Sequence, residues 1–255
     1  MDERQRYRRA RARKFNKPAE PGTVGEVSAT PETGAVPRKR DLRRSLRTRR
    51  RARDPGAGAA TSRAIAELAA GVPWVTRART LAGYVASDGE PDVEIILEAA
   101  RARGALVVLP RQRADGSLEL VVATPETPLA RGASDVLEPA GPAVDPALLP
   151  GPATLLAPAV ALDRLGRRLG RGGGAYDRLL VELRRLGWTI VGVCLAADLL
   201  DELPEEPHDQ RVDAVLVDTG FLVVGEPVGS EPAGSEPAGA ASRAATGSSP
   251  SSRNR

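Results

Sequence analysis

The stretch ATLLAPAVALDRLGRRLGRGGGAYDRLLVELRRLG, residues 153–187, joins a continuous apolar run, three consecutive glycines and an amphipathic segment. The apolar run predicts a buried strand that leads into the glycine loop. Leu179, Leu183 and Leu186 fall on one face of the following segment, which predicts a helix that ends at Gly187. A strand, a loop and a helix in this order are typical of an α/β domain.

The glycine loop is a candidate anion site. Backbone N–H groups of glycine residues can approach a ligand closely, and the N-terminus of the following helix adds a partial positive charge. Arg164, Arg167, Arg168 and Arg178 flank the loop, so phosphate is the natural ligand. The loop lacks the Gly-Lys-Ser/Thr of a Walker A motif and does not fit the dinucleotide pattern Gly-x-Gly-x-x-Gly. On glycine spacing alone, phosphate binding and a flexible turn are equally compatible with it.

Helical and strand patterns alternate along the rest of the chain. Helices are predicted at residues 38–53, at 61–70 with Thr61 or Ser62 as the cap, and at 92–104. Strands are predicted at residues 80–86, 105–110, 118–123, 189–196 and 214–224. Continuous apolar strands that alternate with helices predict an α/β domain, in which helices cover both faces of a mostly parallel sheet.

Two shifts in composition bound this domain. Residues 1–37 are Arg-rich and then polar and proline-punctuated, which predicts a disordered basic arm. Residues 226–255 are rich in Gly, Ser, Pro and Ala, which predicts a disordered tail, and the folded domain is expected at 38–225. Residues 1–53 carry 18 Lys/Arg against 6 Asp/Glu, whereas the remainder carries 19 against 27. The basic character therefore belongs to one end of the chain.

The compartment follows from cysteine content and hydropathy. Cys194 is the only cysteine, which excludes an intrachain disulfide and a metal site built from cysteines. The sequence has no apolar run long enough to cross a membrane and no apolar signal segment at its N-terminus. We therefore expect a cytoplasmic protein without membrane contact.

Five motifs together resemble the 5-formyltetrahydrofolate cyclo-ligases, also called 5,10-methenyltetrahydrofolate synthetases. The longest is APAVALDRLGRRLGRGGGAYDRLL, residues 157–180, which matches the family's Arg-Leu-Gly-x-Gly-x-Gly-Tyr-Tyr-Asp-Arg signature. The other four agree in order and spacing: KRDLR at 39–43, YVASDGEPDV at 84–93, DVLEP at 135–139 and DELPEEPHDQRVDAVLVDTG at 201–220. The resemblance extends over about residues 39–225 and implies a three-layer, Rossmann-like α/β fold.

The resemblance also implies a reaction. Enzymes of this family cyclise 5-formyltetrahydrofolate to 5,10-methenyltetrahydrofolate with ATP as co-substrate and Mg²⁺ as cofactor, releasing ADP and phosphate. The implied partners are thus 5-formyltetrahydrofolate and ATP, and we expect a monomer. Phosphorylation of the formyl oxygen activates it as a leaving group, so no residue is expected to act as a protein nucleophile.

The site residues follow by matching the motifs. The resemblance implies ATP contacts from Lys39, Arg40, Asp41, Leu42, Arg43, Arg168, Leu169, Gly170, Arg171, Gly172, Gly173, Gly174, Ala175 and Tyr176. It implies folate contacts from Val85, Glu90 and Tyr176, and it gives Mg²⁺ to Asp177 and Asp209. By residue type alone, an arginine-rich helix is a solvated face, Asp177 is a first-turn helix acid and Glu90 is a surface acid.

Several positions depart from the family pattern. Ala175 replaces the first tyrosine of Tyr-Tyr-Asp, and LAAD at 195–198 replaces an aromatic-x-aromatic-Gln stretch. Aromatic surface is thus lost where a pterin would stack, which leaves open a nucleotide-binding relative without folate turnover. A third, less favoured hypothesis is nonspecific nucleic-acid binding through the basic arm, which would be salt-sensitive.

Overall fold

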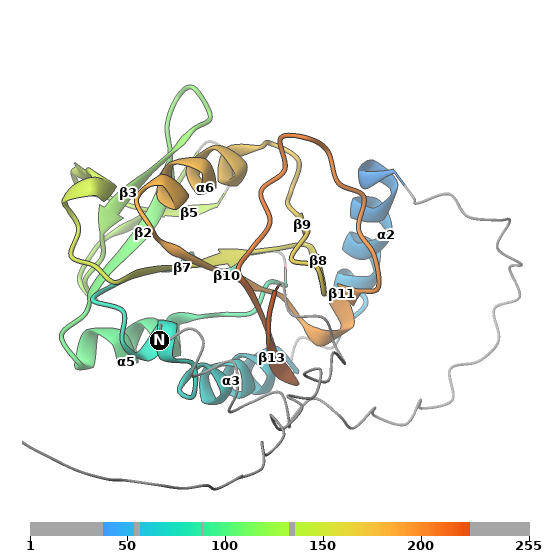
Figure 1. The fold of residues 1–255 in the computed structure, drawn as a ribbon, viewed down its shortest axis with the longest axis horizontal. Coiled ribbons are helices and arrows are strands. Elements are labelled where there is room, and N and C mark those ends of the chain that lie inside the picture. Colours follow the sequence, from blue (N-terminus) through green and yellow to red (C-terminus); the bar gives the residue numbers. More distant parts are fainter. Residues whose placement is uncertain (1–37, 54–56, 88, 133–135, 225–255) are drawn as a thin grey trace, which may run out of the picture. The chain divides into compact units, whose positions relative to one another are not determined.

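The computed structural model describes residues 38–53, 57–87, 89–132 and 136–224. The predicted arm, residues 1–37, and the predicted tail, residues 226–255, lie outside the described residues. The main sheet has the strand order β13-β12-β10-β7-β1-β2-β3-β6 (Figure 1). Its strands are β1 (Thr80–Ala82), β2 (Leu106–Gln112), β3 (Leu118–Val122), β6 (Ala143–Val144), β7 (Ala153–Pro158), β10 (Thr189–Val193), β12 (Ala214–Val217) and β13 (Gly220–Val223).

The central strands of this sheet are parallel, and antiparallel strands lie at both edges. Strands β12, β10, β7, β1 and β2 pair in parallel. Strand β13 is antiparallel to β12, β3 is antiparallel to β2, and β6 is antiparallel to β3. Numbered along the chain, the parallel strands lie in the order 2-1-3-4-5, so the direction of winding reverses between β1 and β7. In such sheets the crevice at the carboxyl ends of these two strands is the usual ligand site.

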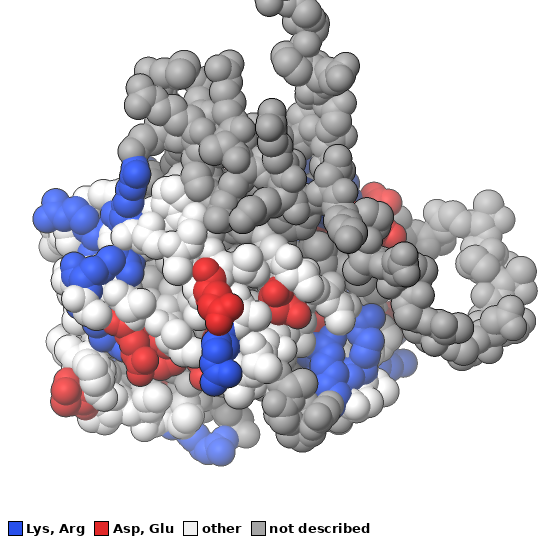
Figure 2. All heavy atoms as spheres, turned by 90° about the horizontal axis from the view of Figure 1, so that it is seen from below, with Lys and Arg blue, Asp and Glu red and all other residues white. Residues whose placement is uncertain are grey.

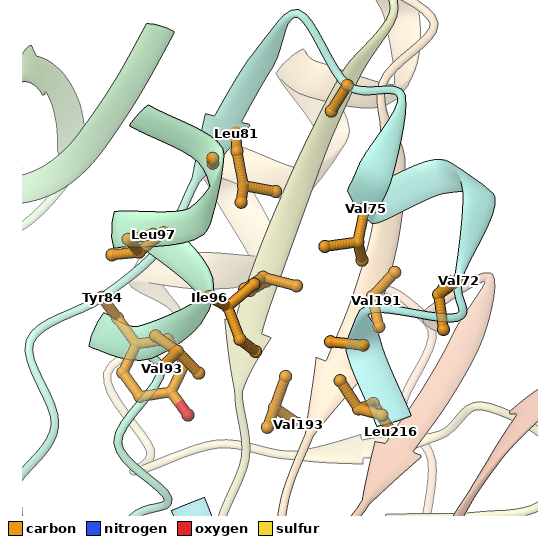
Figure 3. Close-up of a cluster of buried hydrophobic side chains, with 14 of the residues drawn as sticks. Val72, Val75, Leu81, Tyr84, Val93, Ile96, Leu97, Val191, Val193 and Leu216 are labelled. Atoms are coloured by element: carbon orange, nitrogen blue, oxygen red, sulfur yellow. The ribbon is translucent and has the colours of Figure 1, made fainter. Parts of the chain in front are cut away.

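One face of the sheet is covered by α3 (Ala57–Ala69), α4 (Pro73–Thr76) and α5 (Glu94–Ala102). Ile96 and Leu97 of α5 point toward the strands, where Val191 and Leu216 are buried in the same apolar cluster (Figure 3). These side chains follow the spacing of one helical face and one strand face, which is why the local sequence pattern predicts both elements.

The opposite face is covered by α6 (Ala175–Arg185) (Figure 1). Leu179, Leu180 and Leu183 of this helix are buried against Leu155 and Ile190 of the sheet. Helices therefore lie on both faces, and the predicted three-layer, mostly parallel α/β fold is confirmed.

The first described helix, α2 (Lys39–Arg51), stands at one side of the sheet (Figure 1). Leu42 and Leu46 form its apolar stripe and pack with Val160 and Leu203 against a small sheet with the order β11-β8-β9. The strands of this sheet are β8 (Ala161–Asp163), β9 (Arg168–Leu169) and β11 (Leu199–Leu200). The remaining elements are the hairpin β4 (Leu129–Arg131) and β5 (Leu137–Pro139) and the short 3₁₀ helices η1 (Pro146–Leu148) and η2 (Ala196–Asp198).

Four local predictions need correction. The single strand predicted at residues 214–224 is the antiparallel pair β12 and β13, which a turn separates. Residues 153–163 do not form one strand, because Ala159 N–H bonds to Val193 of the main sheet whereas Val160 N–H bonds to Leu169 of the small sheet. The predicted helix at 61–70 begins at residue 57, so its proposed caps lie inside α3. Leu186 is 42% exposed, and Leu180 instead shares the buried face of α6.

Among the described residues, none of the helices combines the length and apolar character that crossing a membrane requires.

Candidate active site

A cleft of about 1450 Å³ opens where β1 and β7 end, at the reversal point of the sheet. Its walls come from the N-terminal half of α2, the loop after β1, the glycine loop with the first turn of α6, and residues 204–209. Segments that are up to 170 positions apart in the sequence therefore meet here.

The glycine loop presents backbone to this cleft. Gly172 has φ 111° and Gly174 has φ 65°, backbone conformations that residues with a side chain rarely adopt. Gly174 is the N-cap residue of α6, and no side chain in the described part of the chain caps this helix end. Its first-turn N–H groups are therefore available to an anion, which the positive end of the helix dipole favours. Arg43 Nε donates to the Gly170 carbonyl at 2.8 Å and holds α2 against the loop.

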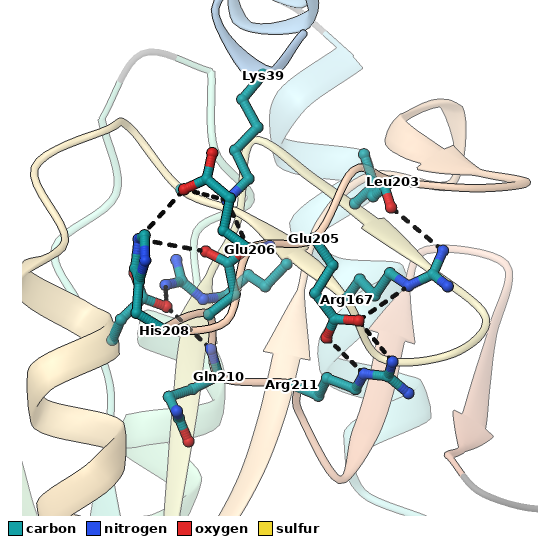
Figure 4. Close-up of polar contacts among 12 residues, drawn as sticks. Lys39, Arg167, Leu203, Glu205, Glu206, His208, Gln210 and Arg211 are labelled. Carbon is teal, nitrogen blue, oxygen red and sulfur yellow. Dashed lines mark hydrogen bonds and ion pairs between the residues drawn. The ribbon is translucent and has the colours of Figure 1, made fainter. Parts of the chain in front are cut away.

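Lys39, at the N-terminus of α2, contacts the segment at 204–209 (Figure 4). Its Nζ lies 2.5 Å from Asp209 Oδ2 and 3.3 Å from Glu206 Oε2. Partial burial favours the protonated form of Asp209, but the hydrogen bond and charge of Lys39 outweigh it and lower the pKa of this carboxyl. Asp209 is therefore ionised at neutral pH and pairs with Lys39.

A second ionic network holds the segment at 204–209 in place (Figure 4). Arg211 donates to both carboxylate oxygens of Glu205 at 2.6 Å, and Arg167 Nε lies 3.5 Å from the same carboxylate. Arg167 also donates to the Leu203 carbonyl at 3.2 Å. Because Arg167 precedes β9, this network ties the carboxylates of the segment to the strand that enters the glycine loop.

Arg168 is a buried cation at the base of the cleft. Its side chain is 2% exposed, and Nη2 lies 2.8 Å from Asp177 Oδ1. The guanidinium also stands 5.6 Å from the centre of the Tyr176 ring, within range of a cation–π interaction. The backbone N–H of Gln210 donates to Asp177 at 3.4 Å. Asp177 thus joins α6 to the segment that carries Asp209.

Glu90 lies on the opposite wall, in the loop after β1. Its side chain is 6% exposed, 3.4 Å from Arg171 of the glycine loop, and accepts from Ser87 N–H at 3.2 Å. Burial raises the pKa of Glu90, although Arg171 partly offsets this effect. Burial also raises the pKa of Tyr84 and of Tyr176, so both phenols are neutral at physiological pH.

The structure gathers most of the predicted residues in this cleft. Of the predicted nucleotide, folate and metal residues, those that line it are Lys39, Arg40, Arg43, Val85, Glu90, Arg168, Gly170, Arg171, Gly172, Gly173, Gly174, Ala175, Tyr176, Asp177 and Asp209.

Three predicted nucleotide residues do not line the cleft. Asp41 is exposed on the first turn of α2. Leu42 and Leu169 pack together in the apolar cluster beneath this helix. The two leucines hold α2 in position, and the structure does not support a direct nucleotide contact for any of the three.

Asp177 and Asp209 fit Mg²⁺ by donor type, because both are partly exposed carboxylates on the same cleft. The hydrogen bonds to these carboxylates end on Oδ1 of Asp177 and on Oδ2 of Asp209, which also accepts from the Glu206 N–H at 2.6 Å. Glu206, His208 and Asp209 form a further group with ligand atoms within 4.8 Å of one another. The Lys39 ammonium contacts both carboxylates of that group and offsets one of their two negative charges.

Sequence reasoning missed several residues of the cleft. Tyr84 and Ser87 flank the predicted Val85 in the same motif, and Glu138 belongs to the matched stretch DVLEP. Arg178, which the sequence placed only beside the glycine loop, also lines the cleft and donates to the carbonyl of Gly116 at 2.7 Å, which ties the turn between β2 and β3 to α6. Their positions within the matched motifs could have identified these residues, but the sequence does not show which way each side chain points.

Aliphatic side chains supply much of the apolar wall. Val85, Leu118, Val136, Leu137 and Val181 line the cleft. They contribute apolar surface to the cleft that Ala175 also lines, whereas residues 195–198, the other departure from the family pattern, do not line it. A planar ligand can therefore still bury its faces here.

The family model described as the 5-formyltetrahydrofolate cyclo-ligase family matches residues 35–218 of this chain. The 5-formyltetrahydrofolate cyclo-ligase of Mycolicibacterium smegmatis is 35% identical over 143 residues, which cover 54% of this chain and 73% of that protein. The 5-formyltetrahydrofolate cyclo-ligase of Escherichia coli K12 is 31% identical over 173 residues, which cover 67% of this chain and 95% of that protein.

Solved structures agree in fold. The NMR structure of Aquifex aeolicus 5,10-methenyltetrahydrofolate synthetase matches with a TM-score of 0.62 at 24% identity, covering 76% of this chain and 96% of that one. A 5,10-methenyltetrahydrofolate synthetase from Mycoplasma pneumoniae matches with a TM-score of 0.56 at 21% identity, covering 70% and 97%. With the family match spanning most of the described residues and the site motifs in one cleft, this chain belongs to the 5-formyltetrahydrofolate cyclo-ligase family.

Proposed function

We propose that this protein cyclises 5-formyltetrahydrofolate to 5,10-methenyltetrahydrofolate in a reaction that consumes ATP, requires Mg²⁺ and releases ADP and phosphate. The observation that carries the proposal is a single cleft in which the cationic end of α2, an uncapped glycine loop and an apolar wall with a buried carboxylate face one another. Such a cleft suits a polyanion and a planar substrate held side by side.

The chemistry needs alignment more than covalent catalysis. The formyl oxygen is a poor leaving group until it attacks the γ-phosphorus of ATP, from which ADP departs. N10 of the folate then attacks the formyl carbon and loses its proton, and the carbon–oxygen bond breaks with phosphate as the leaving group. Each step depends on proximity and on screening of charge, so the protein must chiefly hold the two substrates in line.

The triphosphate is assigned to the glycine loop and α2. The helix N-terminus and the loop N–H groups bind phosphate oxygens, and Lys39 and Arg43 supply positive charge from the facing helix. Arg168 is buried and already paired with Asp177, so its main role is to fix that carboxylate and the Tyr176 ring.

Asp177 and Asp209 would hold Mg²⁺ between the protein and the phosphates. The ion would neutralise charge on the phosphate oxygens. The two carboxylates lie on different segments, and the Gln210 N–H that reaches Asp177 keeps these segments together.

The folate is assigned to the wall formed by the loop after β1. Glu90 offers a carboxylate to the polar edge of the pterin, and Val85 and Tyr176 offer apolar surface to its faces. Arg171 bridges the two halves of the cleft, since it starts in the glycine loop and contacts both Ser87 and Glu90.

The proposal is tested by mixing the purified protein with 5-formyltetrahydrofolate and Mg-ATP and following the methenyl chromophore in the near ultraviolet. Product is expected only when both ATP and Mg²⁺ are present. If nucleotide binds but no product forms, the protein is a nucleotide-binding relative without folate turnover, and the proposed reaction is wrong.

A matched pair of variants adds specificity to this test. Arg43 lines the cleft, whereas its neighbour Arg44 is exposed and does not. Arg43→Gln should raise the KM for ATP about tenfold or more, because a charge-assisted phosphate contact is lost. Arg44→Gln removes the same charge from the same helix and should leave KM unchanged, so equal effects of the two substitutions would indicate a diffuse charge effect.

A nucleic-acid-binding role finds little support on the one face of the molecule that Figure 2 draws. On the face drawn in Figure 2, basic and acidic side chains are interspersed and do not form one basic patch. The basic arm at 1–37 lies outside the described residues. A steep dependence of polynucleotide binding on salt, with no folate turnover, would favour that role instead.

A further inference from the structure

Asp198 is a buried carboxylate surrounded by three arginines from α2 and its C-terminal end. Its side chain is 0% exposed and follows β10 at the end of η2. Arg49 donates to Oδ1 at 2.8 Å and Arg50 to Oδ2 at 3.0 Å. Arg53 binds both oxygens, at 2.7 and 3.0 Å. We call these four residues the Asp198 anchor.

The anchor reaches a third segment through Arg50. This arginine is 5% exposed, and its Nη2 donates to the carbonyl groups of Ala159 and Val160 at 2.9 Å each. Both carbonyls lie between β7 and β8, where the chain leaves the main sheet toward the glycine loop. One side chain therefore fixes α2 to Asp198 and to the start of the phosphate-binding segment.

The charges in the anchor depend on Asp198. Burial alone would raise the pKa of this carboxyl, but hydrogen bonds from Arg53 and Arg49 and the charge of Arg50 lower it instead. Without the carboxylate, Arg49 and Arg53 could turn to water because they are 46% and 24% exposed. Arg50 could not, so a buried cation would lack its counter-ion while α2 stays docked.

Because α2 is a continuous helix, a change at Arg50 also moves the end of the helix that lines the cleft. Arg50 lies eleven positions after Lys39, a length of about 16 Å along the helix. A tilt of about 5° at the anchor would move the Lys39 end by roughly 1.4 Å over that length. A shift of this size would break the 2.5 Å contact of Lys39 with Asp209. Arg43 is seven positions from Arg50, so it would move by about 0.9 Å, which is enough to break its 2.8 Å contact with Gly170.

We propose that the Asp198 anchor positions α2 for nucleotide binding, with Asp198 as the positioning residue. The inference rests on the proposed function, because it assigns the phosphate contacts to the other end of the same helix. Asp198 does not line the cleft and acts only through α2.

The test compares Asp198→Asn with Asp213→Asn. Asp213 is a carboxylate that also accepts from an arginine, Arg184 at 3.0 Å, and from a backbone N–H, that of Ile190 at 2.8 Å. In the described part of the chain its hydrogen bonds do not involve α2. The probe is a non-hydrolysable ATP analogue with Mg²⁺. Its Kd should rise about tenfold in Asp198→Asn and stay within about twofold in Asp213→Asn.

Steady-state kinetics separate positioning from general damage. In Asp198→Asn the KM for ATP should rise while kcat at saturating ATP stays within about twofold of wild type, because bound nucleotide favours the docked helix. A merely structural loss would reduce the folded fraction, lowering kcat with KM unchanged. Asp198→Glu, which restores the charge, should recover part of the lost affinity.

Hydrogen exchange of α2, together with binding of the ATP analogue, distinguishes failure of the positioning role from failure of the proposed function. Amides of α2 should lose protection in Asp198→Asn and keep it in the control. If wild type binds the analogue and Asp198→Asn binds it equally well, the positioning role is refuted and the proposed function stands. If wild type does not bind the analogue, both proposals fail.

A milder variant covers the case in which Asp198→Asn does not fold. Arg53→Gln removes the guanidinium of the partly exposed Arg53 and leaves Arg49 and Arg50 paired with the Asp198 carboxylate. Its Kd for the analogue should rise about threefold, with α2 protection reduced. An unchanged Kd in a folded Arg53→Gln protein would overturn the proposal.

Discussion

The consecutive residues Gly172, Gly173 and Gly174 allow the glycine loop to be tested one position at a time. Gly172 and Gly174 have φ of 111° and 65°, whereas Gly173 is not among the positive-φ glycines. A Cβ at Gly173 would meet nothing within 4 Å, but a Cβ at Gly172 would lie 3.4 Å from Arg43 Cζ. Alanine should therefore be tolerated at the middle position and strained at the other two.

The magnitudes follow from these conformations. Each glycine-to-alanine change restricts the unfolded chain and stabilises by about 0.4–1 kcal/mol where the native backbone accepts alanine. Because this gain is common to the three variants, their differences report native strain alone. Gly174→Ala should be less stable than Gly173→Ala by about 1–2 kcal/mol, the cost of the left-handed region for an L-residue. Gly172→Ala should be less stable by about 1–3 kcal/mol, since its φ is the more unusual and Arg43 must also give way.

The assay is urea unfolding followed by tryptophan fluorescence, with the buried Trp188 as a probe beside α6. With equal slopes, differences in midpoint give the differences in the free energy of unfolding. The KM for ATP should rise in Gly172→Ala, because the displaced Arg43 no longer fixes the loop. If Gly172→Ala proves as stable as Gly173→Ala, the backbone argument for the phosphate loop is wrong.

Three further predictions concern charge and the N-terminus. Asp177→Asn should lower Mg²⁺-dependent turnover by about 100-fold or more, measured by steady-state kinetics, because a metal ligand is lost. It should also destabilise the protein by about 1–3 kcal/mol in urea unfolding, because the 2%-exposed Arg168 loses its counter-ion. Glu90→Gln should weaken folate binding, measured by calorimetry. It should also gain stability relative to wild type as pH rises from the unfolded pKa of Glu90 through its raised folded pKa, because burial penalises only the ionised carboxylate. A parallel pH dependence of unfolding in the two proteins would contradict this. Deletion of residues 1–36 should keep turnover within about twofold at matched salt, whereas deletion of residues 1–43 should abolish it by removing the cationic end of α2.

Local pattern determined the fold class and most elements of this protein. Apolar runs of strand length and leucines at helical spacing depend only on neighbours in the chain, so the strand before the glycine loop and helix α6 were predictable. The run of glycines at 172–174 also indicates an unusual backbone, and Gly172 and Gly174 do adopt conformations that few other residues tolerate. The motif resemblance then indicated which residues to expect in the cleft.

Tertiary contacts decided what those residues do. The sequence suggested a solvated arginine face on α2, but Arg50 is buried on Asp198, a residue 148 positions away. The predicted strand at 153–163 divides because Val160 finds its partner in Leu169 and leaves the main sheet. Periodicity carries no information about such partners, since burial and charge pairing depend on which distant segments the folded chain brings together.

The glycine motif illustrates the division within a single stretch. Its sequence determined a strand, a glycine loop and a helix that begins with an acidic first turn. Only the folded chain decided that Asp177 pairs with the buried Arg168 and that the same carboxylate accepts from Gln210. The physical reason is that backbone conformation is set by adjacent residues, whereas the state of a charged side chain is set by the solvent and counter-ions that the whole fold leaves around it.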